Sequence, residues 1–128
     1  MQLSERNQIG NAKNPYQGKA IKALCVCSAG LLRSPTIARE LTLRGYNTRA
    51  CGTSEKYALV YISEALIHWA DEIHVVKGEA RYLETCLLSL FSDKKDRPKV
   101  IVYDLPDIYG TFDPQLTLKI QEKLDEQV

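Results

Sequence analysis

A single strand–loop–helix pattern constrains the fold of this chain more than any other feature. Residues Ala23-Leu24-Cys25-Val26 form a continuous apolar run, which is typical of a strand buried on both faces of a parallel sheet. Helical spacing of apolar residues follows Pro35, which suits a first helical turn because its missing N–H costs nothing there. The pattern predicts a buried strand that passes through one short loop into a helix.

Residues suited to phosphate chemistry fill that loop, which has the sequence Cys27-Ser28-Ala29-Gly30-Leu31-Leu32-Arg33-Ser34. Backbone N–H groups at a strand-to-helix junction form a cradle for an anion. A thiol in such a cradle, here Cys27, is expected to ionise readily and to act as a nucleophile. Arg33 offers a planar guanidinium for two phosphate oxygens, Ser34 can hydrogen-bond the sulfur, and Gly30 can adopt positive φ. We therefore predict that residues 28–34 bind phosphate.

Strands and helices alternate along the rest of the chain. Strands are expected at residues 47–51, 73–76 and 99–103, and helices at 35–45, after Ser63, at 79–91 and at 114–126. Ser63 and Asp113 are expected to cap the helices that follow them, the first with Ala65, Leu66 and Trp69 on its apolar face. The alternation predicts an α/β fold with three layers, α/β/α, around a four-stranded parallel sheet. The carboxyl ends of such strands share one edge, where we expect Cys27, Thr53, Lys77 and Asp104.

Length and composition fit one small domain. The chain has 128 residues, 45% hydrophobic and 26% charged, and its net charge of +1 argues against a nucleic-acid surface. Residues 1–19 are polar and are expected to form a flexible arm, followed by one domain over 20–128. No apolar stretch has membrane-spanning length and the amino terminus lacks the apolar core of a signal peptide. Four cysteines without metal spacing favour the reducing cytoplasm, no cofactor and no metal; we expect a monomer.

From Lys22 onward the chain resembles the low-molecular-weight protein tyrosine phosphatases. The family pattern is a strand, a cysteine, five residues, Arg-Ser-Pro and a helix, as around Cys27. Three later stretches are also similar to the family, with the closest resemblance to a compact, mostly bacterial and phage branch; they are Ala50-Cys51-Gly52-Thr53-Ser54, Trp69 to Val76, and Val100 to Gly110. The resemblance implies the phosphotyrosine protein phosphatase I-like fold and a phosphocysteine intermediate on Cys27.

The family also uses an aspartate after its last strand as general acid, which protonates the leaving oxygen and then activates water. Asp104 and Asp107 are both candidates, since Asp113 is better suited to capping the last helix. Asp107 is favoured because Pro106 and Tyr109 frame it, but Asp104 stays open. Tyr109 would form an aromatic wall for a phosphotyrosine ring, or simply pack the loop. The implied substrate is a phosphorylated protein or a small phosphomonoester.

Two positions depart from the family pattern. Gly30 stands where the family usually has Asn, and Leu32 where many members carry a second cysteine. A phosphocarrier like the B component of sugar phosphotransferase systems is one alternative, because it also places a cysteine after its first strand. Such carriers normally lack an arginine at the position of Arg33, which favours the phosphatase. A non-catalytic phosphate-binding descendant stays open, whereas a thiol arsenate reductase would need a further cysteine besides Cys86.

Overall fold

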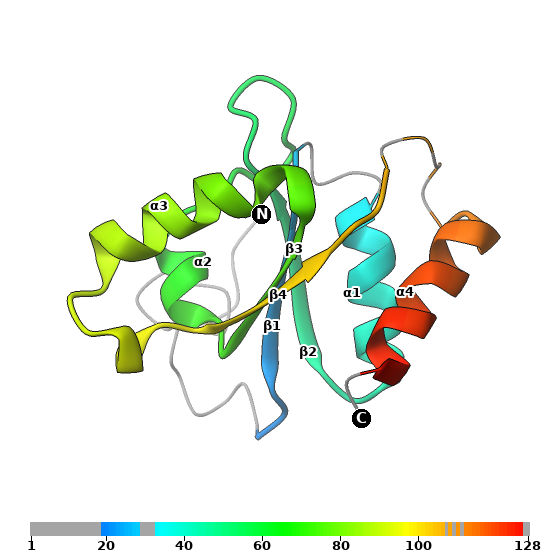
Figure 1. Cartoon of the computed structure of the whole chain (residues 1–128), viewed down its shortest axis with the longest axis horizontal. Coiled ribbons are helices and arrows are strands. Elements are labelled where there is room, and N and C mark those ends of the chain that lie inside the picture. Colours follow the sequence, from blue (N-terminus) through cyan, green and yellow to red (C-terminus); the bar gives the residue numbers. More distant parts are fainter. Residues whose placement is uncertain (1–18, 29–32, 107, 109, 111, 127–128) are drawn as a thin grey trace, which may run out of the picture.

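The computed structural model describes residues 19–28, 33–106, 108, 110 and 112–126, and its centre is a parallel β-sheet. Four strands pair in the order β2-β1-β3-β4, all parallel. The strands are β1 (Lys22–Cys27), β2 (Asn47–Gly52), β3 (Glu72–Val76) and β4 (Lys99–Tyr103). Helices lie on both sides, α1 (Arg33–Leu43) with α4 (Pro114–Glu126), and α2 (Glu64–Trp69) with α3 (Ala80–Leu90) (Figure 1). The predicted α/β class and parallel sheet are confirmed.

The central strand β1 separates two hydrophobic clusters. Because side chains alternate along a strand, Ala23, Cys25 and Cys27 pack with α1 and α4, whereas Leu24 and Val26 pack with α2 and α3. Trp69 fills the second cluster and is completely buried. Burial on both faces explains why β1 is a continuous apolar run from Ala23, and it places Cys27 at the buried carboxyl end of the central strand.

The predicted bounds of α4 and the predicted start of α2 are confirmed, whereas both predicted bounds of α1 are wrong. Helix α4 begins at Pro114 and ends at Glu126, and the Asp113 carboxylate accepts the backbone N–H of Gln115 at 2.8 Å. Ser63 caps α2 by accepting the N–H of Leu66 at 3.2 Å. Helix α1, however, begins at Arg33 rather than at Pro35 and ends at Leu43 rather than at residue 45. The backbone N–H groups of the first turn have no intrahelical carbonyl to bond, so proline, which lacks an N–H, is tolerated anywhere in that turn and does not mark its first residue.

The predicted apolar face of α2 is found in part: Trp69 is buried and Leu66 packs against the same cluster, but Ile67, which was not predicted, is buried as well. Ile67 and Trp69 are its buried residues, whereas Ala65 and Leu66 are only partly buried. A six-residue helix spans less than two turns, so its spacing alone does not fix the face that it buries. Helix α3 is preceded by a 3₁₀ turn at Lys77–Glu79, so the helical segment as a whole begins two residues earlier than predicted.

The connection from α1 to β2 is a tight turn at Gly45. Gly45 has a φ of 94°, which a residue without a side chain adopts without strain, and its N–H bonds the carbonyl of Thr42 at 3.0 Å. This turn brings β2 back beside β1 from residue Asn47. Within the described residues, no helix has the length and apolar character needed to cross a membrane. The arm expected at residues 1–19 lies, apart from Lys19, outside the described residues.

Candidate active site

The sulfur of Cys27 lies at the carboxyl end of β1, facing the first turn of α1. Its Sγ is 3.2 Å from Ser34 Oγ, and both residues are buried, with 2% of Cys27 exposed. Ser34 Oγ is in turn 3.5 Å from the carbonyl oxygen of Cys51 on β2. As a thiol, Cys27 donates to the Ser34 oxygen; once ionised, it can accept from the same hydroxyl, which rotates freely about its C–O bond. The predicted contact between Ser34 and the sulfur is therefore present.

Arg33 joins the start of α1 to the segment that follows β4. Its guanidinium NH1 donates to the backbone carbonyl of Leu105 at 2.9 Å, and only 8% of the residue is exposed. A guanidinium has five N–H donors in a fixed plane, so this bond sets the direction in which the other donors point. Arg33 thus precedes Ser34 in the first turn of α1, and its guanidinium is fixed by the hydrogen bond to Leu105.

A second contact with α1 holds the far end of the same segment. The backbone N–H of Phe112 donates to Thr36 Oγ1 at 3.0 Å, and the Arg39 guanidinium lies 4.2 Å from the centre of the Phe112 ring. Phe112 has a φ of 61°, an uncommon value for a residue with a side chain, which these contacts stabilise. The segment between Leu105 and Phe112 contains the predicted general acid Asp107 and the predicted wall Tyr109, both of which lie outside the described residues.

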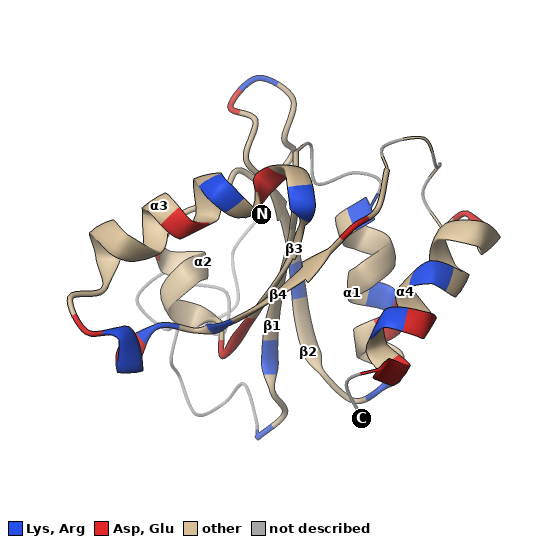
Figure 2. Ribbon diagram, viewed as in Figure 1, with Lys and Arg blue, Asp and Glu red and all other residues tan. Residues whose placement is uncertain are grey.

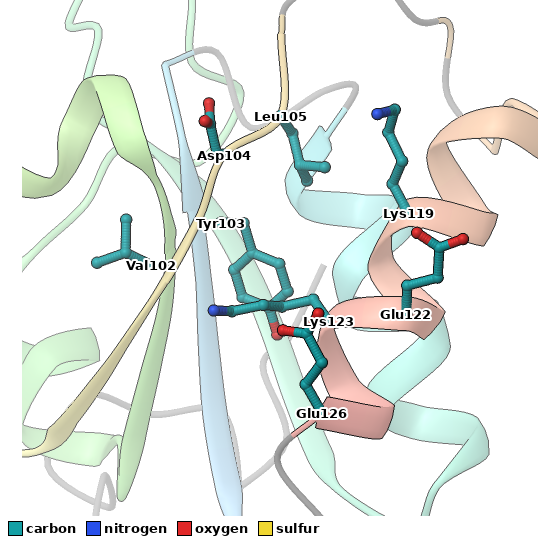
Figure 3. A pocket seen from close by; sticks show the side chains of 8 residues that line it. All are labelled: Val102, Tyr103, Asp104, Leu105, Lys119, Glu122, Lys123 and Glu126. Atoms are coloured by element: carbon teal, nitrogen blue, oxygen red, sulfur yellow. The ribbon is translucent and has the colours of Figure 1, made fainter.

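Asp104, the other candidate acid, is the first residue after β4. Its side chain is 85% exposed, and its carboxylate is 4.0 Å from the ammonium group of Lys77, which follows β3. An exposed pair at that distance contributes little to stability, so both groups can reorient toward a ligand. Asp104 is also one of the residues that line the groove between β4 and α4, together with Tyr103 and Leu105 (Figure 3). No described contact joins Asp104 to Cys27.

The end of β2 is fixed beside Cys27 by backbone hydrogen bonds. Thr53 N–H donates to the Cys27 carbonyl at 3.1 Å, and Ser54 N–H donates to the Ser28 carbonyl at 2.9 Å. The hydroxyl of Thr53 donates to Glu79 at 2.7 Å, which ties this segment to the start of α3. Of the four residues predicted to meet at one edge of the sheet, Thr53 therefore contacts Cys27, and Lys77 contacts Asp104.

The remaining cysteines have different surroundings, and none of the four forms a disulfide. Burial raises the pKa of Cys51 to about 12 and that of Cys25 well above its ordinary value, so both thiols stay protonated. Cys86 is half-buried on α3. Burial also lowers the pKa of His74, against the opposing effect of Glu72, and its ring nitrogens lie 2.6 Å from the Tyr103 hydroxyl and 2.9 Å from Glu72. Both ring nitrogens of His74 are therefore occupied by partners within the core.

Together these contacts form a site with a thiol, a hydroxyl and a guanidinium at one strand–helix junction. The loop residues 29–32, which include Gly30, lie outside the described residues. Sequence reasoning missed the Leu105 carbonyl, Thr36 and Glu79; a backbone acceptor leaves no signal in a sequence.

Among the described residues, no group of three or more His, Cys, Asp or Glu side chains could hold a metal ion. No protein-family model matches the chain, and no curated protein does.

Proposed function

We propose that the chain is a cysteine-dependent phosphomonoesterase of the low-molecular-weight protein tyrosine phosphatase type, with the phosphotyrosine protein phosphatase I-like fold. The observation that carries the proposal is the close approach of Cys27 to Ser34, beside Arg33, in the first turn of α1. The first turn also contributes backbone N–H groups and the positive end of the helix dipole. The proposal gives these three neighbouring side chains separate roles in one reaction.

In the first step, the Cys27 thiolate attacks phosphorus in line with the bond to the leaving oxygen. The S–P bond forms as the P–O bond breaks, and a carboxylic acid gives its proton to the leaving oxygen. Arg33 and the loop N–H groups bind the equatorial oxygens, whose charge is held by donors already in place. The product of this step is a phosphocysteine and a neutral alcohol or phenol.

In the second step, the same carboxylate takes a proton from water as the water oxygen attacks phosphorus. The P–S bond breaks and inorganic phosphate leaves. The Ser34 hydroxyl is 3.2 Å from the departing sulfur, where it can donate to the thiolate and stabilise it. Ser34 therefore acts mainly on the breakdown of the intermediate.

The carboxylate is Asp107 or Asp104, and the anchoring of their segment supports both. Arg33 holds the backbone of this segment at Leu105, one residue after Asp104 and two before Asp107. One hydrogen bond thereby links the phosphate-binding guanidinium to the backbone of the segment that carries the acid. Substrates of the class proposed are phosphoproteins or small phosphomonoesters, and a thiolate nucleophile is consistent with our expectation of a cytoplasmic enzyme.

Turnover of p-nitrophenyl phosphate by the full chain tests this function. A phosphatase releases many equivalents of p-nitrophenol per chain, with or without EDTA, and vanadate inhibits it. A phosphocarrier would instead take up one phosphoryl group per chain and return it slowly to water. A phosphate-binding descendant would bind vanadate without any turnover. Either of the last two outcomes would contradict the proposed function, and the two are told apart by the mass of the protein after incubation.

A further inference from the structure

Strand β4 forms one edge of the sheet and is poorly covered. Its burial differs from that of the other edge strand, β2, whose residues are all buried or half-buried and whose Arg49 lies 4.5 Å from the Trp69 ring. In β4, Val100 and Val102 are each 39% exposed. Among the described residues, only β3 pairs with β4. Figure 1 shows the sheet from this side, with β4 in front of the other strands.

The backbone of β4 offers hydrogen-bonding groups at this open edge. Lys99 N–H donates to the carbonyl of Asp71, so Lys99 directs its backbone toward β3. Successive residues of a strand direct their N–H and C=O groups to opposite sides, so Val100 and Val102 present theirs to the open edge. The two residues that expose apolar side chains are thus the two that expose backbone donors and acceptors.

A groove accompanies β4 on each face of the sheet. One groove, of about 260 Å³, lies between β4 and α4 and is lined by Tyr103, Lys119 and Lys123 among others (Figure 3). The other, of about 220 Å³, lies between β4 and α3 and is lined by Leu83, Leu87, Val100 and Val102 among others. The helices therefore stop short of the edge on both faces, and a further strand can reach β4 without displacing them.

The edge is complementary to itself under two-fold symmetry. Antiparallel pairing centred on Ile101 places Val100 of each copy opposite Val102 of the other, on the same face. The basic residues Arg97 and Lys99 stand where β4 begins and Asp104 where it ends. Figure 2 colours basic residues blue and acidic residues red along the ribbon. Antiparallel pairing sets the basic start of each strand beside the acidic end of the other, whereas parallel pairing would set like charges together.

We propose that two copies of this chain associate through β4, pairing antiparallel about Ile101 into one continuous eight-stranded sheet, twice the four strands of one chain. Val100 and Val102 bury each other across the two-fold axis and exchange backbone hydrogen bonds, which satisfies the edge. A dimer of this kind replaces the monomer expected from the sequence. Pairing of β4 is independent of the chemistry at Cys27.

The molar mass of the full chain in solution tests the dimer. Sedimentation velocity from low micromolar to near-millimolar concentration should show a shift from one copy to two, since a single strand pair makes a small interface. The double variant Val100→Lys, Val102→Lys places two lysines opposite each other in both pairs and should raise the dissociation constant at least about tenfold. Val100→Thr with Val102→Thr keeps the β-branched shape and is the matched control, which should retain dimers. A monomer at every concentration, or a dimer unaffected by the lysines, would overturn the proposal.

Cysteine cross-linking tests the register separately, in a Cys86→Ser background. Ile101 would meet its own copy as a non-hydrogen-bonded pair, with Cα atoms about 4.5 Å apart, which a disulfide can span. Ile101→Cys should therefore cross-link to itself faster than Val100→Cys, although Ile101 is buried and Val100 is exposed. Faster cross-linking of Val100→Cys would indicate random collision or another occupant of the edge, such as residues 1–18, and would overturn this pairing.

Discussion

Cys25 and Cys27 lie two residues apart on the same face of β1, yet their surroundings prepare them for different tasks. Around Cys25, in the middle of the sheet, polar groups are paired with one another, as His74 is with Tyr103 and Glu72. Around Cys27, at the carboxyl end, the Ser34 hydroxyl lies 3.2 Å from the sulfur, and Arg33 stands in the same first turn of α1 with its guanidinium bonded to the Leu105 carbonyl. Under the proposed function, position along the strand, rather than residue type, separates the structural thiol from the reactive one.

The largest effect should come from removing the sulfur at the end of the strand. Cys27→Ser should lower kcat for p-nitrophenyl phosphate by at least about a thousandfold, because no other group can form the intermediate. The matched change Cys25→Ser should lower the urea midpoint, because it buries a hydroxyl in the core, and should largely spare kcat. Equal losses of activity in folded forms of both variants would remove the distinction between the two positions.

Arg33→Lys should give the next largest effect. A lysine cannot both bond the Leu105 carbonyl and pair with two phosphate oxygens, so kcat/KM should fall by about a hundredfold or more. Arg44→Lys serves as the control, since the Arg44 guanidinium bonds Asp125 of α4 at 2.9 Å and, among the described residues, not the segment from Leu105 to Phe112. Steady-state kinetics compares the two variants, and a loss in the control as large as that of Arg33→Lys would contradict the role assigned to Arg33.

The general acid can be identified by comparing two aspartates. Asp107→Asn should lower kcat by about a hundredfold if Asp107 is the acid, as we favour, and Asp104→Asn should then have a small effect. The loss should be smallest for substrates with good leaving groups, which need no proton. Asp113→Asn is the control, because Asp113 caps α4. Loss of activity with Asp104→Asn alone would move the assignment to Asp104, and no loss with either would exclude both.

Ser34→Ala should have a smaller effect, confined to the breakdown of the intermediate. The loss of one hydrogen bond to a thiolate leaving group should slow dephosphorylation by about tenfold. Phosphocysteine should then accumulate, and a burst of p-nitrophenol should precede the steady state in stopped-flow traces. Ser54→Ala, on the neighbouring loop, is the control. Slower burst formation in place of slower turnover would place Ser34 in the first step.

The smallest effect concerns the middle of the sheet and should change stability alone. Burial holds the pKa of His74 below its ordinary value of 6.5, so the unfolded chain binds a proton more readily than the folded one. The free energy of unfolding should therefore be greatest above about pH 6.5 and fall as the pH drops below it. His74→Gln should reduce this slope in urea titrations. An unchanged slope would contradict the burial of neutral His74.

The parts of the structure that could be predicted from the sequence are those that depend on residues close together along the chain. Cys27 and Ser34 flank one short loop, so a strand and a helix on either side bring them together. The parallel sheet followed from apolar runs alternating with helical spacing. The Arg33 contact with Leu105 could not be predicted, because it joins residues 72 apart through a backbone carbonyl that every residue possesses. The open edge of β4 depends on strand order and helix placement, which spacing along a chain does not specify.

Trapping of the phosphorylated enzyme tests the central claim most directly. The full chain is mixed with p-nitrophenyl phosphate, quenched within milliseconds and digested, and the cysteine-containing peptides are compared by mass spectrometry. A phosphoryl group should be found on Cys27, in higher yield with Ser34→Ala, and on neither Cys25 nor Cys51. Turnover without phosphorylation of Cys27, or a phosphoryl group on any other residue, would contradict the account.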